Sequence, residues 1–110
     1  MSILSLTFHC IESTVPQWEQ YARTELKQLA HNLYDVEKYI LSDVESEMLN
    51  EGRNTNLLLI FETVELRATF LENEFENIRE RVEKRFGDEV MIFKTLLNEF
   101  KETDGPTGIG

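Results

Sequence analysis

Apolar residues along this chain follow two spacings, one typical of β-strands and one typical of α-helices. Successive side chains of a strand point to opposite faces, whereas apolar residues three or four positions apart share one face of a helix. The helical spacing occurs twice, after Ser13 and after Thr63. Short apolar segments precede, separate and follow these two stretches, and they predict strands at residues 3–11, 36–44, 56–62 and 90–97.

The first strand, Ile3–Ile11, shows the two-residue alternation most clearly. One face is apolar and carries Leu4, Leu6, Phe8 and Cys10. The other face is mixed and carries Ile3, Ser5, Thr7, His9 and Ile11. If the apolar face packs against the helices, the polar side chains of the mixed face lie on the opposite side of the sheet.

The first helix is expected to begin around Ser13, Thr14 and Pro16, because hydroxyl side chains cap free amide groups and proline is tolerated in the first turn. It is expected to end between Asn32 and Asp35, and His31 then lies on its polar face close to that end. The apolar stripe predicted to face the core, with Trp18 as a core residue, comprises Val15, Trp18, Ala22, Leu26, Leu29 and Leu33.

The second helix is predicted to begin at Thr63 as its cap and to end at Gly87. Leu66 and Phe70 widen the apolar surface near its start. The stripe predicted to face the core comprises Ala68, Leu71, Phe75, Ile78, Val82 and Phe86.

The third strand contains a run, Leu57–Phe61, that is apolar at every position. Such a run is typical of a strand buried on both faces, and its shortness favours a strand over a helix. The element order is then β-α-β-β-α-β, which with right-handed crossovers predicts an α+β, ferredoxin-like sandwich. We expect a four-stranded antiparallel sheet in the order 4-1-3-2, with both helices on one face. The opposite face, which is also apolar, predicts a homodimer in which a second copy covers it.

The charge of the chain narrows the choice of partners. The formal net charge is -10, with 21 acidic and 11 basic residues among 110. An acidic surface repels phosphate groups, so nucleic acid and anionic membranes are not expected partners. A homodimer is the expected assembly, with a small molecule that the sequence does not identify as a further partner.

The single cysteine, Cys10, excludes an internal disulfide and favours a reducing, cytoplasmic compartment. No signal peptide and no apolar run long enough to span a bilayer are recognised. Residues 1–100 are expected to form one domain. Residues 101–110 are rich in glycine and polar residues and are expected to be a flexible tail that contributes nothing to folding.

Candidate ligand-binding residues come from the mixed face of the first strand. Ser5, Thr7 and His9 place convergent polar groups on an otherwise apolar sheet, as in many small-molecule sites. Lys94, on the face of the fourth strand that carries Ile92 and Leu96, is expected to join them and to favour an anionic or carbonyl-bearing ligand. The competing interpretation is that the hydroxyls bond to neighbouring backbone groups, that His9 lies in solvent and that Lys94 extends into water.

Motifs of the common enzyme classes are missing from the sequence. It contains no glycine-rich phosphate loop, HExxH, CxxC or GxSxG, and it predicts no metal site, catalytic residue or cofactor. The favoured function is a non-catalytic homodimeric module that binds a small molecule or a protein. RNA binding by the sheet is disfavoured because it requires stacking aromatic side chains over a basic surface.

One family resemblance covers most of the chain, from about Ile3 to Phe100. Arg85-Phe86-Gly87 at the expected end of the second helix, followed by Phe93-Lys94-Thr95-Leu96-Leu97, resembles the C-terminal signature of the bacterial domain-of-unknown-function family 4286. Lys94 stands where that signature more often has arginine. The resemblance implies a compact α+β domain and no particular activity.

A broader resemblance, to dimeric α/β-barrel proteins, rests on element order alone. It implies the alternative function, a cofactor-independent monooxygenase-like enzyme. Such enzymes place His, Asn and Trp between sheet and helices. Here only His9 is suitably placed, because Trp18 is expected on the first helix and no asparagine is expected within a strand core.

Overall fold

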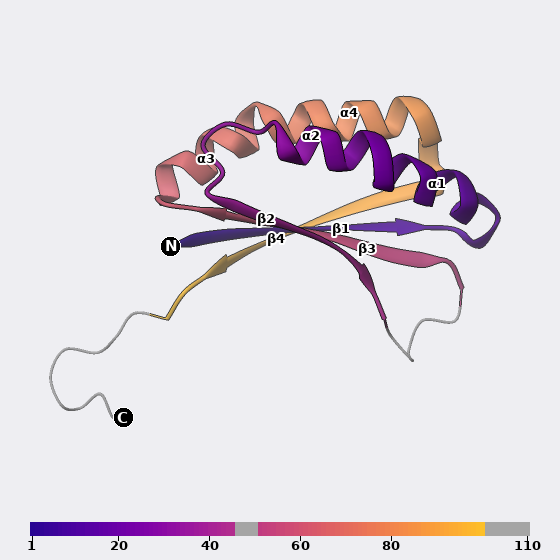
Figure 1. Ribbon diagram of the computed structural model, residues 1–110, viewed down its shortest axis with the longest axis horizontal. Helices are drawn as coiled ribbons and strands as arrows, with labels where there is room; N and C mark the ends of the chain where they lie inside the picture. Colours follow the sequence, from indigo (N-terminus) through magenta and orange to yellow (C-terminus); the bar gives the residue numbers. More distant parts are fainter. Residues whose placement is uncertain (46–50, 101–110) are drawn as a thin grey trace, which may run out of the picture.

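The computed structural model describes residues 1–45 and 51–100, which form two layers, a twisted sheet and a helical layer on one of its faces (Figure 1). The strands are β1 (Ser2–Cys10), β2 (Lys38–Val44), β3 (Arg53–Phe61) and β4 (Val90–Asn98). The first helical segment consists of η1 (Glu12–Thr14), α1 (Val15–Tyr21), a π-helical turn η2 (Ala22–Leu26) and α2 (Lys27–His31). The second consists of α3 (Val64–Glu72), α4 (Glu74–Phe86) and η3 (Gly87–Glu89).

The sheet is antiparallel throughout, and its strand order is β2-β3-β1-β4. Counted from the other edge, this is the predicted order 4-1-3-2, so the ferredoxin-like arrangement is confirmed. The two most apolar strands, β1 and β3, are central, while the more polar β2 lies at an edge, as expected.

The core lies between the sheet and the helices. Leu4, Leu6, Phe8 and Cys10, the predicted apolar face of β1, are all fully buried. Trp18 is at its centre and contacts the rings of three other aromatic residues, Phe8, Tyr21 and Phe86. Its indole Nε1 donates a 2.9 Å hydrogen bond to Thr55 Oγ1, which gives the buried indole N–H an acceptor. The prediction that Trp18 is a core residue is confirmed.

The buried stripe of the first helical segment differs from the predicted one in its C-terminal half. Ala30 is buried, whereas Leu29 and Leu33 are only partly buried. The cause is the π-helical turn at Ala22–Leu26, which takes more residues per turn than an α-helix and rotates the following residues about the helix axis. A spacing rule based on 3.6 residues per turn does not anticipate that rotation.

The second helical segment is capped as predicted, because Thr63 Oγ1 accepts a hydrogen bond from the Leu66 amide and Gly87, with φ of 60°, ends it. Ala68, however, was predicted in the buried stripe and is exposed. The reason is a break at Asn73, whose side chain donates to the Thr69 carbonyl and interrupts the regular helix. The break gives α3 a buried face of its own, on which Arg67 is buried.

Arg67 is a buried cation at the edge of the core. Its guanidinium Nη1 donates 3.0 Å hydrogen bonds to the backbone carbonyls of Ile3 and Leu97. These two residues face each other on β1 and β4. Arg67 therefore ties α3 to two strands of the sheet, and binary patterning did not reveal this contact because an arginine interrupts the apolar stripe.

The face of the sheet away from the helices is less buried than predicted for β3. Leu57, Leu59 and Phe61 are fully buried against the helices, but Leu58 and Ile60, on the opposite face, are only partly buried. The single chain therefore covers one face of this apolar strand.

Among the described residues, no helix combines the length and the apolar character required to cross a membrane. The predicted flexible tail, residues 101–110, lies outside the described residues.

Cys10 is expected to react slowly with alkylating reagents in the folded protein. Burial, together with the carboxylates of Glu89 and Glu12, raises the pKa of its thiol from 9.0 to about 11. At pH 8 the reactive thiolate is then about a hundredfold scarcer than in the unfolded chain. Iodoacetamide labelling of native and urea-unfolded protein measures the ratio, and equal rates would contradict a buried thiol.

Candidate functional site

The candidate site is the sheet face that carries no helices (Figure 1), here called the open face. The strand register places four side chains of each strand on it. They are Ile3, Ser5, Thr7 and His9 of β1, Lys38, Ile40, Ser42 and Val44 of β2, Asn54, Asn56, Leu58 and Ile60 of β3, and Met91, Phe93, Thr95 and Leu97 of β4.

A polar strip of Ser5, Thr7 and Asn56 occupies the middle of the open face. Asn56 Nδ2 donates a 2.7 Å hydrogen bond to Ser5 Oγ and a 3.2 Å hydrogen bond to Thr7 Oγ1. All three side chains are partly buried between their apolar neighbours. The two hydroxyls are therefore bonded to a side chain of the adjacent strand, rather than to neighbouring backbone groups as in the competing interpretation.

His9 continues this strip at one end of β1. Its ring Nδ1 lies 2.7 Å from Asn54 Oδ1, and the pair is partly buried. Because a carboxamide oxygen only accepts hydrogen bonds, His9 donates from Nδ1. The neutral ring then carries its hydrogen on Nδ1, and Nε2 is the atom that can accept a hydrogen bond from a ligand on this face.

Lys94 does not lie with these residues. It is paired with Leu6 in the register of β1 and β4, and Leu6 faces the helices. Its Nζ lies 5.3 Å from the centre of the Phe75 ring on α4, within the range of a cation–π contact. The structure thus brings Ser5, Thr7 and His9 together on one side of the sheet and places Lys94 on the other side.

Asn54 and Asn56 are the residues of this face that sequence reasoning missed. The third strand was predicted to begin at Asn56, whereas β3 begins at Arg53 and so includes Asn54 as well. The expectation that a strand core contains no asparagine was therefore wrong. The signal was present, because Asn54 and Asn56 continue the two-residue alternation of Leu58 and Ile60.

Among the strand residues of the open face, all of which the structure describes, there is no aspartate or glutamate, although 21 of the 110 residues of the chain are acidic. Lys38, near one end of β2, is its single lysine. Apolar side chains flank the polar strip on both edge strands, and several are about half exposed: Met91 52%, Phe93 51%, Ile40 44% and Leu97 40%. Such a face can be buried against another apolar surface without enclosing an unpaired carboxylate.

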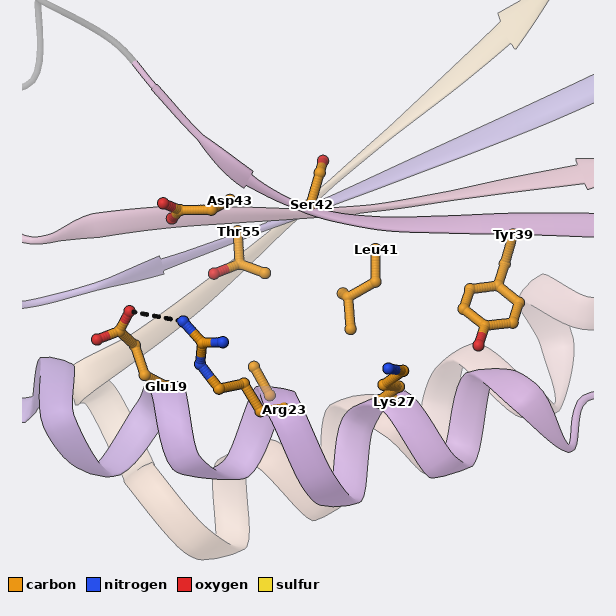
Figure 2. Close-up of a pocket in the computed structure, with 9 residues that line it drawn as sticks. Glu19, Arg23, Lys27, Tyr39, Leu41, Ser42, Asp43 and Thr55 are labelled. Carbon is orange, nitrogen blue, oxygen red and sulfur yellow. Dashed lines mark ion pairs between the residues drawn. The ribbon is translucent and has the colours of Figure 1, made fainter.

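Two hollows lie on the other side of the sheet, at its two edges. One, of about 370 Å³, lies between the first helical segment and β2 (Figure 2). The other, of about 430 Å³, lies between α4 and β4. Ser5, Thr7 and His9 line neither of them. A surface interaction therefore fits the open face better than enclosure of a small molecule.

Residues 1–100 match the model of a family described as domain of unknown function DUF4286. The match confirms the resemblance found in Arg85-Phe86-Gly87 and the residues of β4, and the chain belongs to this family. No curated protein matches the chain.

Several solved structures share the fold at low sequence identity. One, described as a putative antibiotic biosynthesis monooxygenase from Deinococcus radiodurans, is 14% identical, with 96% of this chain and 100% of that chain covered and a TM-score of 0.58. A hypothetical Arabidopsis thaliana protein is 14% identical over 90% of each chain, with a TM-score of 0.57. The de novo designed protein Foldit4 is 14% identical over 86% of this chain and 94% of its own, with a TM-score of 0.51. Likeness at this level shows the fold and carries no activity.

Proposed function

We propose that this member of the DUF4286 family is a non-catalytic binding module that works as a homodimer, in which two copies join through their open faces. The observation that carries the proposal is that, in a strongly acidic chain, the described strand residues of the open face include no carboxylate and carry exposed apolar side chains on both edge strands.

Charge favours a second copy on this face rather than elsewhere on the surface. Each chain carries a formal charge of -10, so most contacts between two copies bring carboxylates together. A two-fold axis places a patch against the same patch of the other copy. On the open face that arrangement brings apolar side chains together without repulsion between carboxylates.

The polar strip is compatible with burial in such an interface. Asn56 supplies hydrogen bonds to both Ser5 and Thr7 within the chain, so these hydroxyls keep a partner when water is removed. An unpaired buried hydroxyl costs about 1–3 kcal/mol, and the internal bonds avoid that cost. Burial of Phe93, Met91, Ile40 and Leu97 then contributes roughly 25 cal/mol for each Å² of apolar surface removed from water.

Small size adds a reason for association. A domain of about 100 residues buries a smaller fraction of its surface than a larger domain does. In this chain the helices cover only one face of the sheet, which lowers the buried fraction further. A standard interface buries about 800 Å² on each partner, which is of the order of one face of a small sheet.

The test is the mass of the protein in solution. Light scattering at low micromolar concentration is expected to give about twice the chain mass of 12.9 kDa. Phe93→Asp places a carboxylate in the centre of one side of the open face, and we expect it to weaken association by more than about a hundredfold, giving a monomer.

Val64→Asp is the matched control, because Val64 is 50% exposed at the start of α3, away from the open face, and Phe93 is 51% exposed. It is expected to leave the dimer intact. A wild-type mass of one chain, or a Phe93→Asp variant that remains dimeric, would contradict the proposal.

A further inference from the structure

The hollow between the first helical segment and β2 has the character of a binding site. We call it the helix–β2 groove, and its volume of about 370 Å³ falls within the range of small-molecule pockets. We propose that it binds a small organic anion, a carboxylate head with an apolar body. The groove lies on the helical side of the sheet, so the proposal is independent of the dimer on the open face.

The body of the groove is apolar. Figure 2 shows Leu41 and Tyr39 projecting from β2 toward the helix, and Ala22 of the helix also lines the space. Leu41 and Tyr39 are partly buried, and Ala22 is buried. These walls suit an aromatic ring or a short aliphatic chain.

A row of basic side chains follows the groove on the helical side. Arg23 and Lys27 line it one turn apart, and His31, one turn further on, lies with its ring 6.4 Å from that of Tyr39. In the described part of the chain Lys27 forms no ion pair, and Arg23 has a single long contact, 4.0 Å to Glu19. Two cations that line one groove of a chain with a net charge of -10 favour an anion in that groove.

The carboxylates at the other end of the groove are already engaged. Arg53 Nη1 lies 2.6 Å from Glu19 Oε2 and 3.7 Å from Asp43 Oδ2. Arg53 therefore offsets part of the negative charge of these two acids, which would otherwise attract a cationic ligand. Arg23, Lys27 and Arg53 together outnumber the two acids by one positive charge, and this excess favours an anion over an amine.

A buried hydroxyl adds a donor to the wall. Thr55 lines the groove and is 7% exposed, and its Oγ1 accepts the hydrogen bond from Trp18 Nε1. Within residues 1–45 and 51–100 no acceptor takes the hydroxyl hydrogen of Thr55. A carboxylate or ether oxygen in the groove would accept it.

The helix that borders the groove is irregular at this point. Ala22 and Arg23, which line the groove, begin the π-helical turn Ala22–Leu26. Single π-helical turns within α-helices are rare and occur frequently at functional sites. The irregular turn sets the position of Arg23 relative to Lys27, and its presence beside the groove is independent of the charge argument.

Amide chemical shifts of isotope-labelled protein test the site, with phenylacetate as the probe and 2-phenylethanol and acetate as its controls. Phenylacetate is expected to shift the amides of groove residues at concentrations up to about 10 mM, a range suited to weak fragments. The alcohol has the ring without the charge and acetate has the charge without the ring, so each is expected to bind at least about tenfold more weakly.

Removal of the two cations tests the charge requirement. Arg23→Gln with Lys27→Gln is expected to lower phenylacetate affinity at least about tenfold. The matched control, Arg81→Gln with Lys84→Gln, removes the same charge from exposed positions of α4 and is expected to leave affinity within about twofold.

Three results would overturn the proposal. They are an absence of shifts in the groove at 10 mM phenylacetate, equal binding of 2-phenylethanol, and an equal loss of affinity in the α4 control variant. Because light scattering reports the dimer separately, failure of the groove and failure of the dimer are distinguishable. An unchanged melting temperature of each variant confirms that it is folded.

Discussion

Trp18→Ala is expected to lower the free energy of unfolding by about 3–5 kcal/mol, the cost of removing a large aromatic side chain from a packed core. The side chain is fully buried and contacts Phe8, Tyr21 and Phe86. Its removal leaves a cavity at the junction of the helices and the sheet. It also deprives Thr55 of its hydrogen-bond donor. Urea unfolding followed by circular dichroism measures the change. The loss is large, because the whole free energy of unfolding of a small domain is only about 5–15 kcal/mol.

Trp18→Phe separates the two parts of this effect. The phenyl ring retains much of the packing but has no N–H group, so a loss of about 1–3 kcal/mol is expected. Equal losses in the alanine and phenylalanine variants would show that the hydrogen bond to Thr55, rather than packing, dominates.

Gly52→Ala is expected to lower the free energy of unfolding by about 3 kcal/mol or more, through two separate effects. Gly52 has φ of 79°, which is unfavourable for a residue with a side chain. In addition, a Cβ at this position would overlap the backbone carbonyl oxygen of Cys10, at the end of β1. The amide of Gly52 donates a 2.9 Å hydrogen bond to Glu12 Oε1, so a shift of the backbone would also disturb that bond.

Gly87→Ala is the matched control because Gly87 also has positive φ, 60°, yet a Cβ there would meet no atom within 4 Å. This variant reports the conformational cost alone, about 1–3 kcal/mol. The difference between the two variants, measured by urea unfolding, is the cost of the contact with β1. Equal losses would contradict the close approach of Gly52 to Cys10.

Sequence reasoning was sufficient for the architecture because local patterns carry the relevant information. The alternation of Leu4, Leu6 and Phe8 identified the buried face of β1, and the cap at Thr63 and the stop at Gly87 identified the ends of the second helical segment. Two helices between four strands then leave few topologies, since crossovers are right-handed and short.

The helix faces were predicted less well, because a fixed period assumes a regular helix. The π-helical turn at Ala22–Leu26 rotates the residues that follow it, which places Ala30 in the core. The break at Asn73 gives α3 and α4 separate buried faces, and Ala68 lies on the exposed side of α3. Local spacing contains no record of either irregularity, since both depend on how the helix fits the sheet below it.

By itself the sequence determined the strands, the helices, their order and the face of β1 on which Ser5, Thr7 and His9 lie. The tertiary structure decided which partners those side chains have. Asn56 reaches Ser5 and Thr7, and Asn54 reaches His9, only because β3 pairs with β1 in one register. The register also places Lys94 beside Leu6, on the helical side. Pairing between residues about 50 positions apart follows from how the whole sheet packs, and a shift of one residue would move every side chain of a strand to the other face.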